Sequence, residues 1–250
     1  VCEANAGNIP VLGIPAGVKM YSGCYAVNPR IAGTLLKAFL LDKPLTYELR
    51  EVMDVEEDLL GKPFVSPALY GYLKTCNEGA MLQGSKVSSS TNGQEAEILA
   101  EYIISQMKKD TLYIIGPGST TYRIKERLLD EGTLLGVDAF KNGKLLEKDA
   151  DEKSLLELLQ NEKAAEIIVT CIGGAGFVFG RGNQQISPSV IRQVAKEHIH
   201  LAVTKSKLAG LRGHPMLVDT GDPDVDRYLC GYYKIHFDSR ETAIYRIESM

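Results

Sequence analysis

The stretch EAEILAEYIISQMKKDTLYIIGPGSTT, residues 95–121, decides the class of fold. Its first part repeats apolar residues at the i, i+3, i+4, i+7 spacing of one helical face: Ala96, Leu99, Ala100, Ile103, Ile104 and Met107. The apolar run 111–115 has the length and composition of a buried strand. The small and hydroxyl-bearing residues 116–121 then lead into a helix over 120–129. Helices alternating with a strand of these lengths predict an α/β fold.

The same alternation extends in both directions from this stretch. We predict further strands at 9–14, 45–60, 134–137, 166–171, 199–204, 216–219 and 232–237, and further helices at 30–41, 154–159 and 188–198. Ser187 and Pro188 suit the N-cap and first position of the last of these helices. The polar run 87–94 is a candidate hinge. The sequence therefore predicts two parts, residues 1–90 and residues 91–250, the second an α/β domain with a mainly parallel sheet.

Composition excludes several classes of protein. The chain has 250 residues, of which 44% are hydrophobic and 24% charged, so it can bury a core and is not a disordered protein. Its formal charge of −4 argues against a nucleic-acid partner. It contains neither an apolar run long enough to span a bilayer nor a signal peptide, so we predict no membrane partner.

The cysteines and histidines point to no metal site. The five cysteines are scattered without a CxxC pair, which argues against both a disulfide framework and zinc and favours the cytoplasm. His198 and His200 could share a strand face, but a helix end that runs into a strand explains them better. Residues 1–8 are typical of a helix end, which suggests that a further segment precedes Val1.

Two loops that follow predicted strands are candidate phosphate sites. The first contains Gly13, Pro15, Ala16, Gly17 and Lys19, where small residues allow close backbone approach and the lysine can meet a phosphate. A turn with a solvated lysine is the alternative.

The second loop contains Gly116, Gly118, Ser119, Thr120 and Thr121 and leads into a helix N-terminus, which offers free N–H groups to an anion. A turn capped by Ser or Thr is the alternative, and we favour phosphate binding.

A third loop is unusually rich in glycine. Five glycines fall within residues 173–182, a density whose entropic cost is hard to explain by structure alone. In this loop Arg181 can hold a phosphate through two hydrogen bonds, and the amides that follow can contact a base or ribose. The candidate residues are Gly173, Gly174, Gly176, Gly180, Arg181, Gly182, Asn183, Gln184 and Gln185. The alternative is a flexible loop that packs Phe177 and Phe179 inward.

A fourth loop, 219–226, is acidic. Asp222 suits an N-cap with Pro223 in the first helical position, but capping explains neither Asp219 nor Asp226. Asp219, Thr220 and Asp222 are candidates to contact a ribose or Mg²⁺. Three glycine-rich loops and one acidic loop together suggest a nucleotide or phosphate ligand, without separating kinase from dehydrogenase or transferase.

Five motifs resemble one known family in order along the chain: PVLGIPAGVKMYSGCYAVNP, GPGSTT, TLLGVDA, IGGAGFVFGRGNQQISP and VDTGDPDVD, which begin at residues 10, 116, 133, 172 and 218. This is the ATP-NAD kinase-like family, of the type associated with acetoin catabolism. In that family a Gly-Gly-Asp-Gly-Thr motif precedes the first of these segments and supplies the catalytic Asp, and it is not in this sequence. The sequence also departs from the family at Ala175, where Gln is expected, and at 237–241.

The resemblance implies an activity and its cofactors. Residues 1–90 would be the remnant of an NAD kinase-like nucleotide domain, and the whole protein would transfer phosphate from ATP or polyphosphate to the 2′-hydroxyl of NAD, with Mg²⁺. It also implies a homo-oligomer. A nucleotide-binding module without catalysis, or a fragment of a longer enzyme, is the first alternative, and a separate small-molecule enzyme domain from Glu95 onward is the second.

Overall fold

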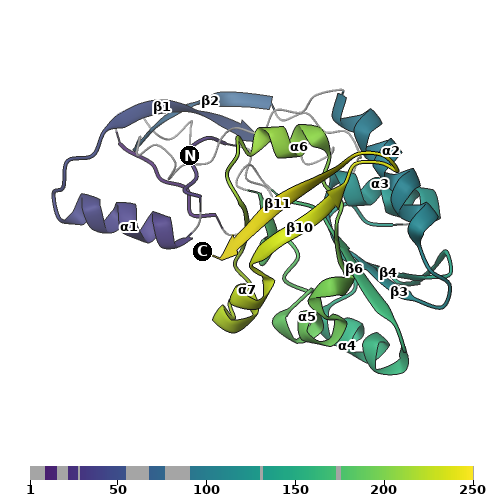
Figure 1. The fold of residues 1–250 in the computed structure, drawn as a ribbon. Helices are drawn as coiled ribbons and strands as arrows, with labels where there is room; N and C mark the ends of the chain where they lie inside the picture. The colour runs from purple at the N-terminus through teal and green to yellow at the C-terminus, as the bar shows by residue number, and fades with distance from the viewer. Residues whose placement is uncertain are drawn as a thin grey trace. The chain divides into compact units, whose positions relative to one another are not determined.

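A computed structural model describes residues 9–15, 22–27, 29–54, 68–76, 91–129, 132–172 and 176–249. These residues form two compact units, one within residues 1–88 and the other from residue 89 onward (Figure 1). Each unit has its own core, and the second carries most of the candidate loops.

In the first unit, the described residues form one helix and one hairpin. Helix α1 spans Pro29–Leu40, and strands β1 (Tyr47–Asp54) and β2 (Ala68–Cys76) pair antiparallel. A small core joins Leu35 and Cys76.

The predicted buried strand at 9–14 is wrong. Ile9 and Ile14 are exposed, and the segment makes a single parallel bridge between Gly13 and Tyr25. Pro10 cannot donate to a strand ladder, which leaves the backbone with isolated hydrogen bonds such as Val11 N–H to Lys74 O at 2.8 Å.

The second unit is built around a five-stranded sheet in the order β5-β4-β3-β6-β8. Strands β3, β6 and β8 run parallel, and β4 and β5 continue the sheet antiparallel. The bounds are β3 Leu112–Ile115, β4 Asp138–Lys141, β5 Lys144–Glu147, β6 Ala165–Val169 and β8 Ile199–Leu201. Figure 1 shows α2 and α3 together on one side of this sheet and α4 and α5 on the other.

The side chains of β3 explain these layers. Tyr113 and Ile115 join a core with α2 and α3, whereas Leu112 and Ile114 join a larger core with α4 and α5. Every residue of β3 is buried, as expected for a strand that is covered on both faces. The helices are α2 Thr91–Gln106, α3 Ser119–Leu128, α4 Glu152–Asn161 and α5 Pro188–Val194, and a 3₁₀ helix, η3, spans Lys196–His198.

A four-stranded sheet in the order β10-β11-β9-β7 completes the second unit. Strands β7, β9 and β11 are parallel, and β10 forms an antiparallel hairpin with β11. The bounds are β7 Phe177–Phe179, β9 Met216–Val218, β10 Gly231–His236 and β11 Thr242–Ser249, with α6 at Lys205–Gly210 and α7 at Pro223–Leu229. Its buried side chains share the larger core, and the α/β class with parallel strands is confirmed.

Three further expectations need correction. Residues 134–137 form no strand, and 134–136 are bends. The Gly136 carbonyl accepts a hydrogen bond from Lys125, and the carbonyls of Leu134 and Val137 accept from the N–H groups of Gly118 and Ala150, which lie outside strands. The predicted hinge 87–94 overlaps α2, which begins at Thr91. The helix predicted to reach His198 ends at Val194, because Ala195 has a φ of 66°.

Other local expectations are confirmed. Ser187 caps α5 by accepting from the Val190 N–H, with Pro188 as the first helical residue. His198 ends the 3₁₀ helix and His200 lies in β8, so the pair does mark a helix end that runs into a strand. Cys24, Cys76, Cys171 and Cys230 carry thiols rather than disulfides.

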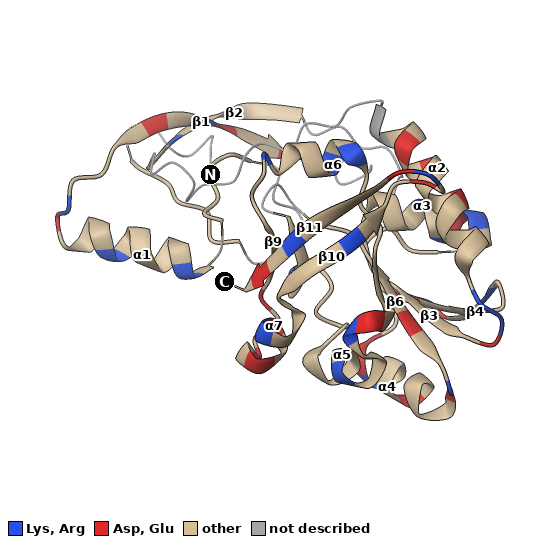
Figure 2. Ribbon diagram, viewed as in Figure 1, with Lys and Arg blue, Asp and Glu red and all other residues tan. Residues whose placement is uncertain are grey.

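Two surface properties can be read from the described residues. None of their helices combines the length and the apolar character that crossing a membrane requires. Figure 2 shows acidic and basic residues interspersed along the helices of the second unit.

Candidate functional site

The strongest candidate site lies at the carboxyl ends of β7 and β9. These strands are parallel neighbours, and Phe179 pairs with Val218 at their last residues. The segment expected to be one glycine-rich loop contains β7, whose Phe177 and Phe179 are buried, as the alternative expected. Its second part, residues 180–185, follows β7, and the acidic loop follows β9, so the fold brings together parts of two of the four candidate loops. In open α/β sheets, ligands bind beyond the carboxyl ends of the strands.

The two loops approach so closely that a glycine is required. Gly180 has a φ of 86°, and a Cβ at this position would overlap the Asp219 carbonyl oxygen. The Asp219 N–H also donates to the Phe179 carbonyl at 3.2 Å. Gly180 is therefore required for a structural reason: without a side chain, it lets the ends of β7 and β9 come into contact.

A buried arginine is fixed between the loops. Arg181 is 5% exposed, its Nη2 lies 3.1 Å from Asp219 Oδ2, and its guanidinium lies 4.5 Å from the centre of the Phe177 ring. Ion pairing and stacking together hold the planar group in one orientation. The Asp219 side chain is 38% exposed, so the pair places a carboxylate that solvent can reach beside an oriented cation.

The amides of the glycine-rich loop have different surroundings. Asn183 is buried, its Nδ2 donates to the Val178 carbonyl at 2.8 Å, and its Oδ1 accepts from the Gly180 N–H at 3.1 Å. It therefore shapes the loop from within. Gln184 is exposed and Gln185 is half-buried, so their amides are the more accessible ones.

The acidic loop is held by its own carboxylates. Asp222 caps α7 as expected, with Oδ1 accepting from the N–H groups of Asp224 and Val225. Its pKa is lowered, first by the hydrogen bond from Arg192 and then by that from Val225 N–H. Asp226, which capping left unexplained, accepts from the Thr220 N–H at 2.9 Å and from the Thr220 hydroxyl at 2.6 Å. It fixes the turn that presents Asp219.

A second candidate region lies at the carboxyl ends of β3 and β6. Gly118 has a φ of 123° and precedes α3, and a Cβ there would lie 2.6 Å from Thr170 Cγ2. The N-cap of α3 is Gly118 and makes no side-chain cap, so the alternative of a Ser or Thr cap is wrong. Thr120 and Thr121 are buried, whereas Ser119 is exposed at the helix start.

Sequence reasoning missed a lysine in this region. Lys207 lies on α6, and its Nζ donates to the Thr170 hydroxyl at 2.9 Å and to the Cys171 carbonyl at 3.4 Å. Because Thr170 also contacts the Gly118 loop, the fold places an ammonium group near the α3 N-terminus. The available signal was Thr204, an N-cap residue three positions after the end of β8.

The remaining candidates lie in the first unit, in the second unit or outside the described residues. Gly13 forms the bridge to Tyr25, and Pro15 is buried in the first unit. Gly116, Gly176 and Gly182 lie in the second unit, where Gly176 and Gly182 have positive φ angles. Ala16, Gly17, Lys19, Gly173 and Gly174 lie outside the described residues.

Comparison with known families decides what these loops belong to. The model of the ATP-NAD kinase C-terminal domain matches residues 104–247, which is more than half of the chain. This chain belongs to the ATP-NAD kinase family. No curated protein and no solved structure gave a match.

The NAD kinase match contains both candidate regions of the second unit. It covers the α3 N-terminus, Lys207, the glycine-rich loop after β7 and the acidic loop after β9. Gly13 and Pro15 precede the matched residues. A kinase-type enzyme family therefore accounts for an α/β unit whose strand ends carry glycine loops, an oriented arginine and an accessible carboxylate.

Proposed function

We propose that this NAD kinase-like chain takes part in phosphoryl transfer from ATP or polyphosphate to the 2′-hydroxyl of NAD, which forms NADP. The observation that supports this most is the Arg181–Asp219 pair at adjacent strand ends within the residues matched by the NAD kinase family. An oriented guanidinium suits a phosphate, and a neighbouring carboxylate suits a ribose hydroxyl.

Each loop has a proposed role in holding nucleotide. Arg181 and Asp219 would position one nucleotide, with Gln184 and Gln185 as accessible amides. The α3 N-terminus and the ammonium group of Lys207 would meet phosphate at the other strand ends. Phosphoryl transfer depends mainly on positioning and charge neutralisation, which are what these groups supply. The catalytic Asp of the family motif has no counterpart in this sequence, and we assign that role to no residue here.

The described residues could bind Mg²⁺ only together with substrate phosphates, because they offer too few ligands of their own. They contain no group of three or more His, Cys, Asp or Glu side chains arranged to hold a metal ion. In the acidic loop, Asp222 and Asp226 are engaged by hydrogen bonds. Asp224 is exposed but pairs with Arg227 within α7, whereas Asp219 is an accessible carboxylate at the end of β9. Mg²⁺ in phosphoryl-transfer sites is often held by one or two carboxylates together with substrate phosphates. When bound with the donor nucleotide, the ion would neutralise the donor phosphates, and Asp219 would hold it.

The same proposal extends to the domain organisation, the localisation and the oligomeric state. Residues 1–90 would be part of the family's N-terminal nucleotide domain, and residues 91–250 would form the second domain. We also propose a cytoplasmic homo-oligomer whose partners are nucleotides rather than nucleic acid or membrane.

Two measurements test the proposed function. NADP formation is assayed with NAD and either ATP or polyphosphate, on this chain and on the full-length gene product. Equilibrium dialysis then measures binding of NAD and ATP to this chain. NADP formed by either protein supports the proposal and identifies the donor. Binding without NADP formation by either protein would support a non-catalytic nucleotide module instead, and no binding at all would refute a nucleotide site.

A further inference from the structure

A cavity of about 330 Å³ lies at the amino ends of the parallel strands of the five-stranded sheet, opposite the carboxyl ends that carry the Gly118 loop. Its lining includes Thr111 and Ala164, which directly precede the parallel strands β3 and β6, together with the last turn of α5 and the 3₁₀ helix η3. The Gly118 loop follows the other end of β3, about 13 Å away at 3.3 Å per residue. The cavity is therefore separate from the proposed nucleotide loops.

The cavity wall carries an excess of positive charge. Its charged or titratable side chains are Lys108, Lys163, His198 and Glu166, and Gln193 adds an amide. Within the described residues, neither Lys163 nor His198 has an ion-pair partner. Two lysines face one carboxylate, in a chain whose net charge is −4.

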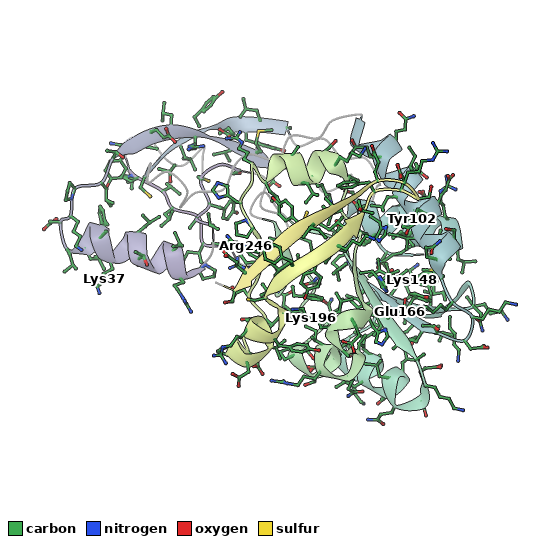
Figure 3. All side chains as sticks on the ribbon, viewed as in Figure 1. Lys37, Tyr102, Lys148, Glu166, Lys196 and Arg246 are labelled. Carbon is green, nitrogen blue, oxygen red and sulfur yellow. The ribbon has the colours of Figure 1, made fainter. Side chains whose placement is uncertain are left out.

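The single carboxylate is already neutralised by neighbours. Glu166, labelled on β6 in Figure 3, is buried and accepts hydrogen bonds from Lys108 Nζ at 2.7 Å and from His200 Nε2 at 2.9 Å. Burial would raise the pKa of Glu166, but the hydrogen bond from Lys108 and the neighbouring His200 outweigh it and hold the pKa below its ordinary value. Glu166 therefore stays ionised and paired, and the unpaired charge of the cavity is positive.

The backbone that closes the cavity is in an unusual conformation. Ala195, between α5 and η3, has a φ of 66° and a ψ of 151°, which side-chain-bearing residues rarely adopt. Such conformations cost about 1–3 kcal/mol and cluster at functional sites. Here the conformation turns the chain from α5 into η3, which places Gln193 and His198 in the same wall.

We propose that this cavity binds a small phosphorylated anion, as a second site beyond the proposed nucleotide loops. Lys163 and Lys108 would supply ammonium groups to the phosphate oxygens, and His198 and Gln193 would supply further donors. A volume of about 330 Å³ exceeds what one phosphate group fills and is at the lower end of small-molecule sites. The ligand class is therefore a phosphate carried on a small organic group or on a second phosphate.

Binding of inorganic pyrophosphate to the ¹⁵N-labelled 250-residue chain tests the site by NMR. We expect saturable shifts of the amides at 163–166 and 193–198. Lys163→Gln should weaken this binding by at least tenfold, and adding His198→Gln should weaken it further. The matched control is Lys148→Gln, which removes the same charge at an exposed lysine outside the cavity and should change the Kd less than twofold.

Other outcomes of the titration would overturn the site. Shifts confined to 116–121 and 181–185, no shifts at all, or equal loss of binding in the Lys148 and Lys163 variants would each contradict it. Equal shifts with acetate at matched ionic strength would mean an adventitious ion only. An Arg181→Ala variant should keep the cavity shifts, so a failure of the nucleotide proposal stays distinguishable from a failure of this one.

Discussion

The ammonium group of Lys125 lies 2.7 Å from the Asp138 carboxylate, and neither side chain reaches solvent. Lys125 on α3 also donates to the carbonyls of Thr133 and Gly136, and Asp138 accepts from Thr133 and from the Asp149 N–H. This network fixes the segment between α3 and β4. It thereby supports the helix whose N-terminus is a candidate phosphate site.

Removing the cation alone should strongly destabilise the protein. Lys125→Met leaves the Asp138 carboxylate buried beside fewer donors, and breaking a buried pair in this way costs about 3–5 kcal/mol. Urea unfolding measures the free energy. The control is Lys153→Met, on the exposed face of α4, where a surface pair contributes at most about 1 kcal/mol. Similar losses in both variants would show that the buried network adds no stability.

Acid should weaken the same network. Burial raises the pKa of Asp138, but the Lys125 charge and the hydrogen bonds outweigh burial and lower it below 3.8. A carboxyl whose pKa is lowered by folding stabilises the protein above its unfolded pKa, and this stability is lost as the pH falls through the folded pKa. The free energy of unfolding should therefore fall with pH below about 4, and less steeply in Asp138→Asn. Equal slopes in the two proteins would contradict this.

Because the backbone of Asp219 lies so close to Gly180, we expect any side chain at position 180 to destabilise the protein. Gly180→Ala places a methyl group against the Asp219 backbone, so overpacking of about 1–3 kcal/mol adds to the cost of the positive φ. Gly143→Ala is the matched control, because Gly143 has a φ of 73° and nothing within 4 Å of an added Cβ. Thermal or urea unfolding should show the larger loss at Gly180. Equal losses would mean that the loops can separate freely.

The orientation of Arg181 predicts that its shape matters as well as its charge. Arg181→Lys keeps the charge but loses the planar group that stacks on Phe177 and pairs with Asp219, so NAD or ATP binding should weaken about tenfold or more. Arg227→Lys, at an exposed pair on α7, should leave binding unchanged. Isothermal titration calorimetry distinguishes them, and unchanged affinity in Arg181→Lys would remove this arginine from the site.

Much of the fold follows from local pattern. The apolar run 111–115 and the capping residue Ser187 gave β3 and the start of α5 because periodicity and capping act over a few residues. The segment 134–137 could not be predicted in this way, because its carbonyls accept hydrogen bonds from the Lys125 side chain and from the N–H groups of Gly118 and Ala150, all outside strands. The strand Thr242–Ser249 was missed although its burial alternates along most of its length.

For the site, the sequence located loops but not the contacts between them. Arg181 and Asp219 were both candidates, yet only the parallel pairing of β7 with β9 joins them across 38 residues. Asn183 and Asp226 have side chains suited to ligands, but both are used in hydrogen bonds within the loops. Only the folded structure shows these hydrogen bonds. Lys207 lies in no recognisable sequence motif. Its position next to Thr170 depends on the direction of α6 relative to β8.

The order of strands in the four-stranded sheet sets when the site can assemble. Strand β9 is paired with β7 on one side and with β11 on the other, and β11 ends at Ser249. Contacts between segments far apart in sequence form slowly, because the chain between them must be ordered first. A nascent chain therefore cannot complete this sheet until β11 has been synthesised, so the strand that carries Asp219, the partner of Arg181, has both of its neighbours only then.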